Sequence, residues 1–398
     1  MKNSKGTILY IGGFELPDKN AAAHRVLNNA KIFSKIGYDV AFVGIDKSLN
    51  YKNNIFTTEK KVNNFTSWSI PYPNSTKEWG DYLTNTNNLE KVIDTFSDLK
   101  AVICYNYQSI SFIKLKKSCE KKGILVLADA TEWYSTKNSN LLFKVLKGTD
   151  SFTRMRMIHK KVSGIIVISK YLETYYKKSN ENVLRLPALV DLTEDKWNNK
   201  IKDNQTNIKK LVYAGSPGKD KDKLDLLIES LSKLRDDLDY QLKVVGLTEI
   251  EYLNKYNTST EKLKKLGNRV VFLGRISHEK SLEVIKSADF SIFIRNSTRE
   301  TNAGFPTKFS ESISCGTPVL TTNTSDLSLY LKEGVNGFFL EIEDEKKLNK
   351  KLEYILTYDR EKNNRMKKEC KNSKLFDYTN YISETETFLK KIRRNEMM

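Results

Sequence analysis

Residues 299–320 of this sequence read RETNAGFPTKFSESISCGTPVL, and they predict one helix and the strand that follows it. Proline is tolerated at the start of a helix and glycine is favoured just after its end, so Pro306 and Gly316 predict the two ends of that helix. A short apolar strand over residues 318–321 comes next. A loop, a helix and a strand in this order are typical of a parallel sheet with helices packed on it.

The loop before this helix is a candidate ligand-binding segment. Gly304, Phe305 and Pro306 would lie at the helix N-terminus, where backbone N–H groups favour phosphate or sugar hydroxyls. Glu311 would lie inside the helix, on the side that faces the loop. A carboxylate there can accept two hydrogen bonds from a vicinal diol such as a ribose. The segment therefore predicts contacts to a phosphate and to a ribose.

Short apolar strands alternate with amphipathic stretches along most of the chain, and this rhythm predicts the α/β class, with parallel sheets covered by helices. Residues 46–98, rich in Asn, Ser, Thr and Lys, are expected to form irregular loops with one helix near the end. The predicted strands are residues 7–11, 39–45, 101–105, 124–128, 164–169, 211–214, 242–245, 270–273, 290–294, 318–321 and 337–340. The predicted helices include residues 21–36, 109–122, 223–235, 281–288 and about 378–393.

The chain of 398 residues is long enough for two domains, since single hydrophobic cores rarely grow beyond about 250–300 residues. The alternating pattern gives way to polar residues over residues 187–210, as expected of a surface connection between domains. We therefore expect an N-terminal domain over residues 1–187 and a C-terminal domain that begins at residue 188.

Basic residues outnumber acidic ones by 67 to 49, which gives a formal net charge of +18. Such an excess favours anionic partners: nucleic acid, an acidic membrane face or phosphorylated small molecules. The basic residues are spread along the chain without a nucleic-acid-binding motif, so nucleic acid is not expected as a partner. Residues 143–161, where basic and apolar side chains are interleaved, and the basic tail at 390–394 are candidate membrane contacts. Packing against its own domain is the alternative for the first of these segments.

No stretch approaches the roughly 18–20 apolar residues that span a bilayer, and the N-terminus lacks a signal-peptide core. We therefore expect a soluble, cytoplasmic protein. The four cysteines are scattered without the spacing of metal ligands. Asp220-Lys221-Asp222 has the form of a DxD metal motif, but neighbouring lysines would compete with a metal, so no metal is expected.

A glycine turn with the sequence Gly-Ser-Pro-Gly at residues 215–218 follows a predicted strand and leads to Lys219, Lys221 and Lys223. Glycines and lysines at a helix start suit a diphosphate, because backbone N–H groups and ammonium groups both act on its oxygens. A solvated basic loop is the alternative interpretation. Arg275 follows another strand at its carboxyl end, where open α/β sheets bind ligands.

The first half of the chain offers further candidates. Gly12-Gly13 follows the first predicted strand, where either an anion site or a structural turn is expected. Asp129 and Glu132 follow a later strand at its carboxyl end, and a helix cap explains Asp129 equally well. His24, near the first helix start, is a candidate for acceptor contact, with a surface or capping role as the alternative.

In these features the sequence resembles the retaining GT-B glycosyltransferases of family 4, the glycosyl transferases group 1, which transfer a sugar from a nucleotide-diphosphate donor. The resemblance in the alternation of predicted strands and helices covers almost the whole chain, from the first glycine turn to the final helix. It is most specific over residues 304–340. There Gly-Phe-Pro, Lys308, Glu311, Cys-Gly-Thr-Pro-Val and the run EGVNGF at 333–338 stand in the family's order.

The resemblance implies a GT-B fold, in which two Rossmann-like domains have parallel sheets that face a central cleft. The C-terminal domain, residues 188–375, would bind the donor. The N-terminal domain would bind the acceptor and would be completed by the final helix, about 376–398.

Carried over by position, Glu311 would bind the ribose, Gly304 and Phe305 would offer amides to the donor, and Lys221 would neutralise the diphosphate. A slip of two positions within the lysine group is the alternative to Lys221. Lys221 and Glu311 are thus the expected catalytic residues, and neither a metal nor a separate cofactor is expected. The expected donor-binding set is Gly215, Ser216, Lys219, Lys221, Arg275, Glu300, Asn302, Gly304, Phe305, Pro306, Lys308 and Glu311, and the expected acceptor-side set is Gly13, His24, Asp129 and Glu132.

Two positions depart from the family pattern. The family's two glutamates lie eight positions apart, and Ala303 takes the place of the first, which usually contacts the donor sugar. An altered sugar preference, substitution by Glu300 or Asn302, or loss of catalysis would follow. The family's arginine in the strand-to-lysine loop is Ser216 here, and Arg275 is a candidate replacement.

The sequence therefore predicts a retaining, metal-independent glycosyltransferase that uses a nucleotide-diphosphate sugar, with UDP as the expected carrier. The expected acceptor is a glycan or a lipid-linked sugar in cell-surface polysaccharide or glycoconjugate synthesis, at the inner membrane face. Two alternatives stay open: a catalytically idle glycan- or nucleotide-binding subunit of a glycosyltransferase complex, and a GT-B sugar-nucleotide epimerase or phosphorylase.

Overall fold

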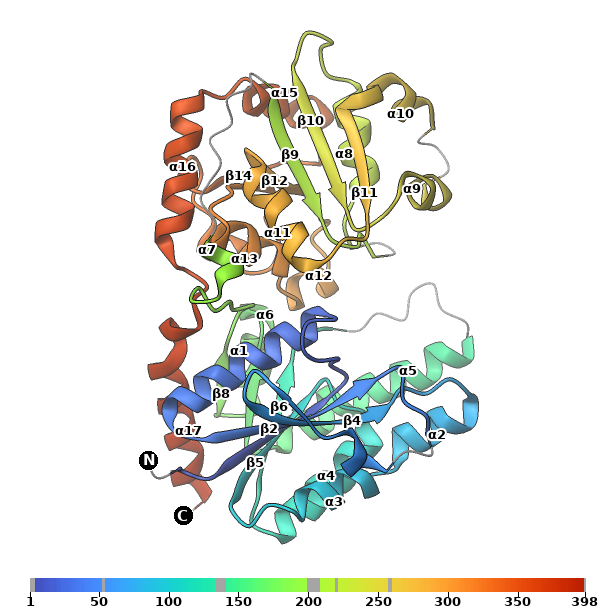
Figure 1. Ribbon diagram of the computed structural model, residues 1–398, viewed down its shortest axis with the longest axis vertical. Coiled ribbons are helices and arrows are strands. Elements are labelled where there is room, and N and C mark those ends of the chain that lie inside the picture. The colour runs from blue at the N-terminus through green and yellow to red at the C-terminus, as the bar shows by residue number, and fades with distance from the viewer. Residues whose placement is uncertain are drawn as a thin grey trace. The chain divides into compact units, whose positions relative to one another are not determined.

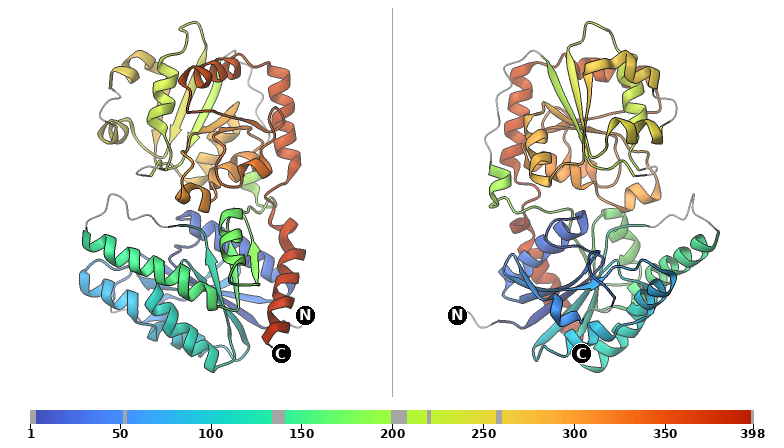
Figure 2. Two further views of the ribbon diagram at one scale, coloured as in Figure 1. Left: turned by 180° about the vertical axis from the view of Figure 1, so that it is seen from behind. Right: turned by 45° about the vertical axis from the view of Figure 1, so that its right-hand side comes forward.

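Strands and helices alternate along the chain and form two separate sheets in the computed structural model (Figure 1). Helices cover both faces of each sheet (Figure 2), so the predicted α/β class with two parallel sheets is confirmed. The structure describes residues 4–51, 54–133, 141–198, 208–218, 221–256 and 260–396. Unit 1 consists of Met1–Leu189, Ala303–Phe305 and Tyr378–Met398, and unit 2 consists of Val190–Asn302 and Pro306–Asp377.

The sheet of unit 1 has the strand order β3-β4-β2-β1-β5-β6-β7-β8, and within the described chain only β3 pairs antiparallel. Every residue of β1, near the centre of the sheet, is buried. The strands are β1 (Thr7–Gly12), β2 (Asp39–Asp46), β3 (Lys60–Val62), β4 (Phe65–Pro71), β5 (Leu99–Tyr105), β6 (Leu125–Ala130), β7 (Gly164–Val167) and β8 (Val183–Arg185). The helices are α1 (Ala21–Ile36), α2 (Thr76–Thr84), α3 (Asn87–Ile93), α4 (Ser109–Lys121), α5 (Leu141–Thr153), α6 (Lys170–Lys177) and α17 (Ile382–Glu396), with short 3-10 segments η1 (Ile55–Thr58), η3 (His159–Lys161) and η5 (Tyr378–Tyr381) and a π-helical turn η2 (Arg154–Ile158).

Local sequence accounts for both ends of α1, which has the predicted bounds. At the N-terminus the Asn20 side chain accepts a hydrogen bond from the Ala23 N–H at 2.8 Å and so satisfies one of the unpaired donors of the first turn. At the C-terminus Gly37 adopts a left-handed conformation with φ 108°, which glycine adopts without strain. The apolar face between these caps packs on the sheet.

The final helix, α17, packs within unit 1 on the edge of the sheet where β7 begins. Gly164 opens β7, and a Cβ built on it would lie only 2.5 Å from Ile392 Cδ1. Both Ile392 and its neighbour Phe388 are buried. A glycine at this strand position therefore allows close contact between α17 and the sheet.

The sheet of unit 2 is entirely parallel over the described residues, with the order β11-β10-β9-β12-β13-β14. Its strands are β9 (Lys209–Ala214), β10 (Tyr240–Val245), β11 (Val270–Gly274), β12 (Phe290–Phe293), β13 (Val319–Thr321) and β14 (Gly337–Phe339). The helices are α7 (Asp195–Asn198), α8 (Leu224–Ser232), α9 (Glu249–Lys255), α10 (Thr260–Leu266), α11 (His278–Ser287), α12 (Arg299–Ala303), α13 (Thr307–Ser314), α14 (Leu327–Tyr330), α15 (Glu345–Leu356) and α16 (Arg360–Ser373), and η4 (Gly267–Arg269) is a 3-10 turn.

Each strand predicted from the sequence has a counterpart whose ends differ by at most two residues. The expectation of irregular loops over residues 46–98 was wrong, because β3, β4, α2 and α3 lie there. The strand β4 pairs parallel with β2, and its polar residues Ser67 and Ser69 are buried, so the usual contrast between apolar and polar positions is missing. Within the described chain, no helix combines the length and apolar character needed to cross a membrane.

A buried histidine lies where α5 passes through the π-helical turn into η3. His159 is 1% exposed, its Nδ1 lies 2.8 Å from the Tyr176 hydroxyl, and its ring meets the Phe112 ring edge-on. Burial lowers the pKa of His159 well below its ordinary value, and the Arg154 charge lowers that pKa further. The folded protein therefore holds this imidazole in its neutral form.

We expect acid to destabilise unit 1 through His159. Below about pH 6.5 the unfolded chain binds a proton that the folded chain does not, so the free energy of unfolding should fall by up to about 1.4 kcal/mol per pH unit. His159→Gln should remove that slope. Urea unfolding of the unmodified chain and of His159→Gln at pH 7, 6 and 5 measures how the free energy of unfolding depends on pH. The same pH dependence in both proteins would contradict a buried, neutral His159.

Candidate functional site

The strand order of unit 2 identifies where a ligand is expected to bind. The strand that follows β9 in sequence, β10, lies on one side of it, and β12 lies on the other. In open α/β sheets, ligands bind outside the carboxyl ends of the strands at such a change of direction. Gly215 follows β9 and Arg295 closely follows β12, so both lie at this switch point.

Three loops at this edge are held close together by backbone hydrogen bonds. The Gly215 N–H donates to Val245 at 3.0 Å, and the Gly246 N–H donates to Gly274 at 2.8 Å. Gly215 has φ 122° and Gly246 has φ 113°. A Cβ on Gly246 would lie 2.6 Å from the Gly215 carbonyl oxygen, so this approach requires glycine. The loops after β9, β10 and β11 thus form one crowded backbone surface.

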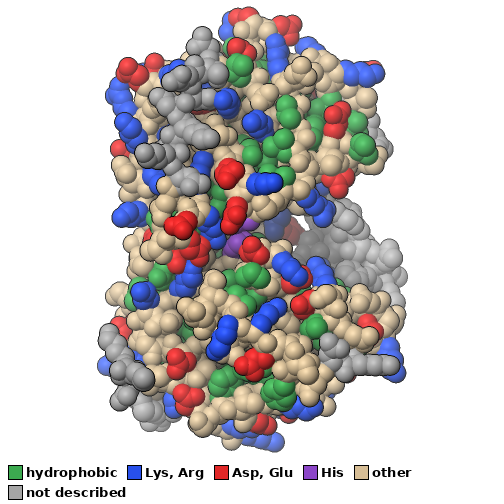
Figure 3. Space-filling model, viewed as in Figure 1, with side chains coloured by type: hydrophobic (Ala, Val, Ile, Leu, Met, Phe, Trp, Pro, Cys, Tyr) green, Lys and Arg blue, Asp and Glu red, His purple; other side chains and the backbone are tan. Residues whose placement is uncertain are grey.

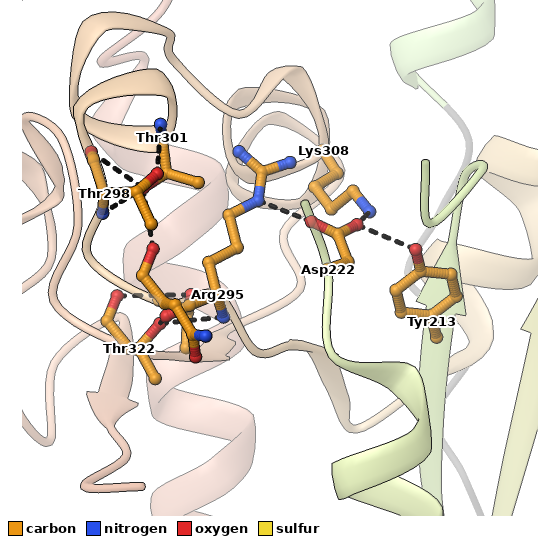
Figure 4. Close-up of polar contacts among 9 residues, drawn as sticks. Tyr213, Asp222, Arg295, Thr298, Thr301, Lys308 and Thr322 are labelled. Atoms are coloured by element: carbon orange, nitrogen blue, oxygen red, sulfur yellow. Dashed lines mark hydrogen bonds and ion pairs between the residues drawn. The ribbon is translucent and has the colours of Figure 1, made fainter. Parts of the chain in front are cut away.

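A buried ionic cluster lies beside these loops (Figure 4). Asp222 accepts a hydrogen bond from Arg295 Nε at 2.6 Å and one from the Tyr213 hydroxyl at 2.7 Å, and it also pairs with the Lys308 ammonium. Asp222, Arg295 and Lys308 are 2%, 7% and 8% exposed. Two cations therefore share one buried carboxylate, and the Glu311 carboxylate, three residues along α13 from Lys308, also acts on the Lys308 charge.

The charges of the cluster shift the pKa values of its members. Burial alone would raise the pKa of Asp222, but the charges of Lys308 and Arg295 outweigh it and hold that pKa at about 2. Burial lowers the pKa of Lys308, although Asp222 opposes the shift. The Lys308 ammonium lies 4.2 Å from the centroid of the Tyr213 ring. A Cβ built on Gly215 would lie 3.4 Å from the Lys308 ammonium nitrogen. A buried cation thus stands directly against the glycine loop.

The backbone of Arg295 is fixed from a third strand. The Arg295 N–H donates to the Thr322 hydroxyl at 3.0 Å, and that hydroxyl donates to the Arg295 carbonyl at 2.6 Å. Hydrogen bonds between Thr298 and Thr301, each from a backbone N–H to the other's hydroxyl, stabilise the next turn at the start of α12 (Figure 4). The backbone that carries the Arg295 guanidinium is therefore held by hydrogen bonds on both sides.

Helix α13 brings Lys308 and Glu311 together, since residues three apart lie on one face of a helix. Pro306 is the N-cap of α13, and in the described structure no side chain caps that end. Gly304 and Phe305 precede it in the chain and are buried. The helix N-terminus, with its partial positive charge, thus adds to the buried cations.

Glu311 is partly exposed and meets a histidine that the sequence analysis did not select as a ligand-binding residue. Its Oε1 lies 3.3 Å from Nε2 of His278, the first residue of α11, and the two side chains are 22% and 20% exposed. The pairing joins α13 to α11.

The other residues of the expected donor-binding set lie in varied surroundings. Ser216, Lys221 and Arg275 are exposed, whereas Lys219 falls outside the described residues. Glu300 is half-buried on α12.

The amide of Asn302 is used within its own loop region. Its Nδ2 donates to Ser297 Oγ at 3.0 Å, and its Oδ1 accepts from the Ser325 N–H at 2.9 Å. These contacts indicate a structural role for this side chain, which joins the turn before α12 to the segment after β13.

On the expected acceptor side, Asp129 lies at the end of β6 and is fully buried. Arg25 pairs with it at 2.7 Å, the Tyr10 hydroxyl donates to it, and the Arg25 guanidinium also reaches the Leu186 carbonyl oxygen at 2.8 Å. Asp129 thus stabilises the interior of unit 1, and its acceptor-side role stays a prediction. The remaining residues of the set differ in exposure: Gly13 is exposed, and His24 and Glu132 are half-buried.

Sequence reasoning missed Asp222, Arg295 and His278 as members of the site. Arg295 closely follows a predicted strand, which is the signal that could have found it. Asp222 was considered only as a metal ligand, and the described residues contain no group of three or more His, Cys, Asp or Glu placed to hold a metal ion.

We expect Asp222→Asn to lower the free energy of unfolding by about 3–5 kcal/mol, because it leaves two buried cations without their carboxylate. In the unmodified chain the contribution of Asp222 is present above about pH 4 and is lost as the pH falls toward its folded pKa of about 2. Urea unfolding at pH 7, 4 and 3 measures both effects. Asp236→Asn, at an exposed position of the same unit, is the matched control. An Asp222→Asn protein as stable as this control would contradict the role of the cluster.

Comparison with known proteins agrees with this architecture. Residues 194–373 match the family model of the glycosyl transferases group 1. The uncharacterized glycosyltransferase MJ1069 of Methanocaldococcus jannaschii is 24% identical over 258 residues, which are 60% of this chain and 58% of that protein. This chain therefore spans little more than half the length of that relative.

Solved structures resemble the chain over nearly its full length. Sucrose-phosphate synthase from Thermosynechococcus elongatus superposes with a TM-score of 0.71 at 15% identity, over 98% of this chain and 100% of that one. Anabaena Alr3699/HepE in complex with UDP superposes with a TM-score of 0.64 at 13% identity, over 97% and 100%. At such identities the likeness shows a shared fold. Residues 194–373 are thus similar to the glycosyl transferases group 1, and the chain has the fold of a GT-B glycosyltransferase.

Proposed function

We propose that this group 1 glycosyltransferase transfers a sugar from a UDP-sugar to a glycan or lipid-linked acceptor, with retention of anomeric configuration and without a metal. The observation that supports it best is the buried cluster at the switch point of unit 2. Two cations share the Asp222 carboxylate there, and one of them, Lys308, lies one helical turn from Glu311. An anionic ligand with an adjoining diol, such as a nucleoside diphosphate, fits both features.

In this proposal Lys308 and Arg295 hold the diphosphate, together with the N-terminal amides of α13 and the glycine loop at Gly215. Lys221, the residue favoured from the sequence, is exposed, whereas Lys308 is buried against that loop. A cation in a buried site interacts more strongly with an anion than one in water. Lys308 and Arg295 thereby replace the charge that Ser216 lacks, and Glu311 accepts hydrogen bonds from the ribose diol.

The reaction then depends on stabilising the leaving group. The bond between the sugar C1 and the phosphate oxygen breaks while a bond from C1 to the acceptor oxygen forms on the same face. The acceptor's proton passes to the departing phosphate oxygen. Lys308, Arg295 and the α13 amides stabilise the charge that develops on the diphosphate. This route requires no carboxylate nucleophile, in keeping with Ala303 at the position of the family's glutamate.

The proposal for the donor's base and sugar has two further observations behind it. Solved structures of Anabaena Alr3699/HepE are in complex with UDP and with UDP-glucose, which supports UDP as the carrier here. We propose that Glu300 takes over part of the sugar contact that Ala303 cannot make, since Asn302 is engaged in its own loop region.

We further propose that the acceptor is met at an anionic membrane surface through unit 1. The segment α5-η2-η3 buries Arg154 and His159 but exposes Phe152 (52%) and Met157 (54%). The basic residues Arg156, Lys160 and Lys161 are exposed on the same segment, as in helices that lie at a membrane surface. Figure 3 shows basic and acidic side chains interspersed over the face it displays, so the proposal rests on this segment and not on net charge.

Transfer of labelled sugar tests the proposed activity. The unmodified chain is incubated with UDP-, GDP-, ADP- and dTDP-sugars and a panel of glycan and lipid-linked acceptors, with and without EDTA. The label is expected to move from a UDP-sugar to an acceptor with its anomeric configuration kept and with no effect of EDTA. Transfer only with a partner subunit would support the idle-subunit alternative suggested by Ala303. Free or isomerised nucleotide sugar would support the epimerase or phosphorylase alternative.

Glu311→Gln should weaken UDP binding by about 1.5–3 kcal/mol, because the amide replaces a charged acceptor and presents an N–H group to the diol. Titration calorimetry measures the affinity. Glu279→Gln, at an exposed position on α11, is the matched control and should bind UDP normally. Equal affinities for the two variants would remove Glu311 from the ribose site.

Binding to anionic vesicles should depend on the exposed basic residues of the α5-η3 segment. Each Lys or Arg near an anionic surface contributes about 1 kcal/mol, which salt screens. Arg156→Glu/Lys160→Glu should therefore abolish co-sedimentation with phosphatidylserine vesicles at low salt. The matched control carries the same charge change on α16, Lys362→Glu/Lys368→Glu, and should sediment like the unmodified chain. Equal losses in both double variants would reject this surface.

A further inference from the structure

We propose that His278 is a positioning residue for nucleotide recognition: it orients the Glu311 carboxylate toward the ribose diol and so sets the preference for ribose over deoxyribose. The observation is the 3.3 Å approach of His278 Nε2 to Glu311 Oε1. The inference rests on the proposed function, in which Glu311 receives the nucleotide's ribose.

The chemistry of the pair assigns a direction to this contact. An ionised carboxylate only accepts hydrogen bonds, so Nε2 of His278 carries the hydrogen and donates it to Oε1. In the proposed function, the two ribose hydroxyls donate hydrogen bonds to this same carboxylate. A long side chain such as glutamate loses rotamer freedom when it is ordered, and a fixed donor supplies that order before the nucleotide arrives.

His278 is itself held in place by two neighbouring elements. It is the first residue of α11, whose N-cap Ser277 accepts a hydrogen bond from the Lys280 N–H at 3.3 Å. Its ring meets the buried Trp197 ring of α7 edge-on, with centroids 6.4 Å apart. The donor that meets Glu311 therefore has a defined orientation.

This geometry predicts a selective effect on nucleotides that differ at one hydroxyl. UDP presents both the 2′- and the 3′-hydroxyl to the carboxylate, whereas 2′-deoxy-UDP presents one. Misorientation of Glu311 should therefore weaken UDP binding more than 2′-deoxy-UDP binding. General damage to the site would weaken the binding of UDP and of 2′-deoxy-UDP equally.

Four variants separate the hydrogen bond from its surroundings. His278→Ala removes the ring, His278→Phe keeps an aromatic ring against Trp197 without the N–H, and His278→Gln restores an N–H donor. Ser277→Ala removes the helix cap but keeps the histidine. Calorimetry with UDP and 2′-deoxy-UDP, and thermal unfolding without ligand, are measured for each variant and for the unmodified chain.

We expect His278→Ala and His278→Phe to raise the Kd for UDP roughly 3- to 10-fold, the loss typical of one hydrogen bond, with less than a twofold change for 2′-deoxy-UDP. His278→Gln should stay within about threefold of the unmodified chain for UDP, as rescue by one donor requires. Ser277→Ala should unfold at a lower temperature and should raise the Kd for UDP less than His278→Ala does, because the histidine is kept.

Unchanged UDP affinity in both His278→Ala and His278→Phe would overturn the inference while the proposed function stands. Equal losses for UDP and 2′-deoxy-UDP would also overturn it, because they would indicate a merely structural role. Failure of the unmodified chain to bind any uridine nucleotide would overturn the proposed function, and this inference with it.

Discussion

The candidate donor site depends on a carboxylate, that of Asp222, held between the Arg295 guanidinium and the Lys308 ammonium. Each group comes from a different part of unit 2: the loop after β9, the segment after β12 and helix α13. The pairing therefore fixes the geometry of the switch point and keeps two cations at an edge where neither could be buried alone. The Glu311 carboxylate at the same edge also acts on the Lys308 charge.

Unit 1 provides an instructive contrast. There the buried Asp129 at the end of β6 pairs with one arginine, Arg25, and also accepts from the Tyr10 hydroxyl. One carboxylate faces one cation, so the charges balance and no anion is needed. The same kind of interaction is thus present in both units, and in unit 2 it includes a second cation.

Much of this fold could be predicted from the sequence because its signals are local. The capping of α1 by Asn20 and Gly37 lies within a few residues, and the apolar runs of the strands are continuous. The strand β4 escaped prediction because Ser67 and Ser69 are polar yet buried. The burial of these serines follows from the pairing of β4 with β2, which periodicity within β4 cannot reveal.

The site was harder to predict than the fold, because its contacts join distant residues. Asp222 meets Arg295 and Lys308 across 73 and 86 positions of sequence. Proximity in sequence to the glycine loop favoured Lys221, but the folded chain brings Lys308 to that loop from α13. Glu311 could be selected from its helical position, whereas its partner His278 depends on the packing of α11 near α13, which no motif encodes.

The affinities of the unmodified chain for UDP, UMP and uridine test the central claim most directly, namely that the two cations paired with Asp222 hold a diphosphate. The three ligands share the base and the ribose and differ only in phosphate charge. If Lys308, Arg295 and the α13 amides hold the diphosphate, calorimetry at low salt should show UDP binding at least tenfold more tightly than UMP, with uridine weaker again. Added salt should narrow the differences only modestly, because buried charges are little screened. Equal affinities for UDP and uridine would contradict the account.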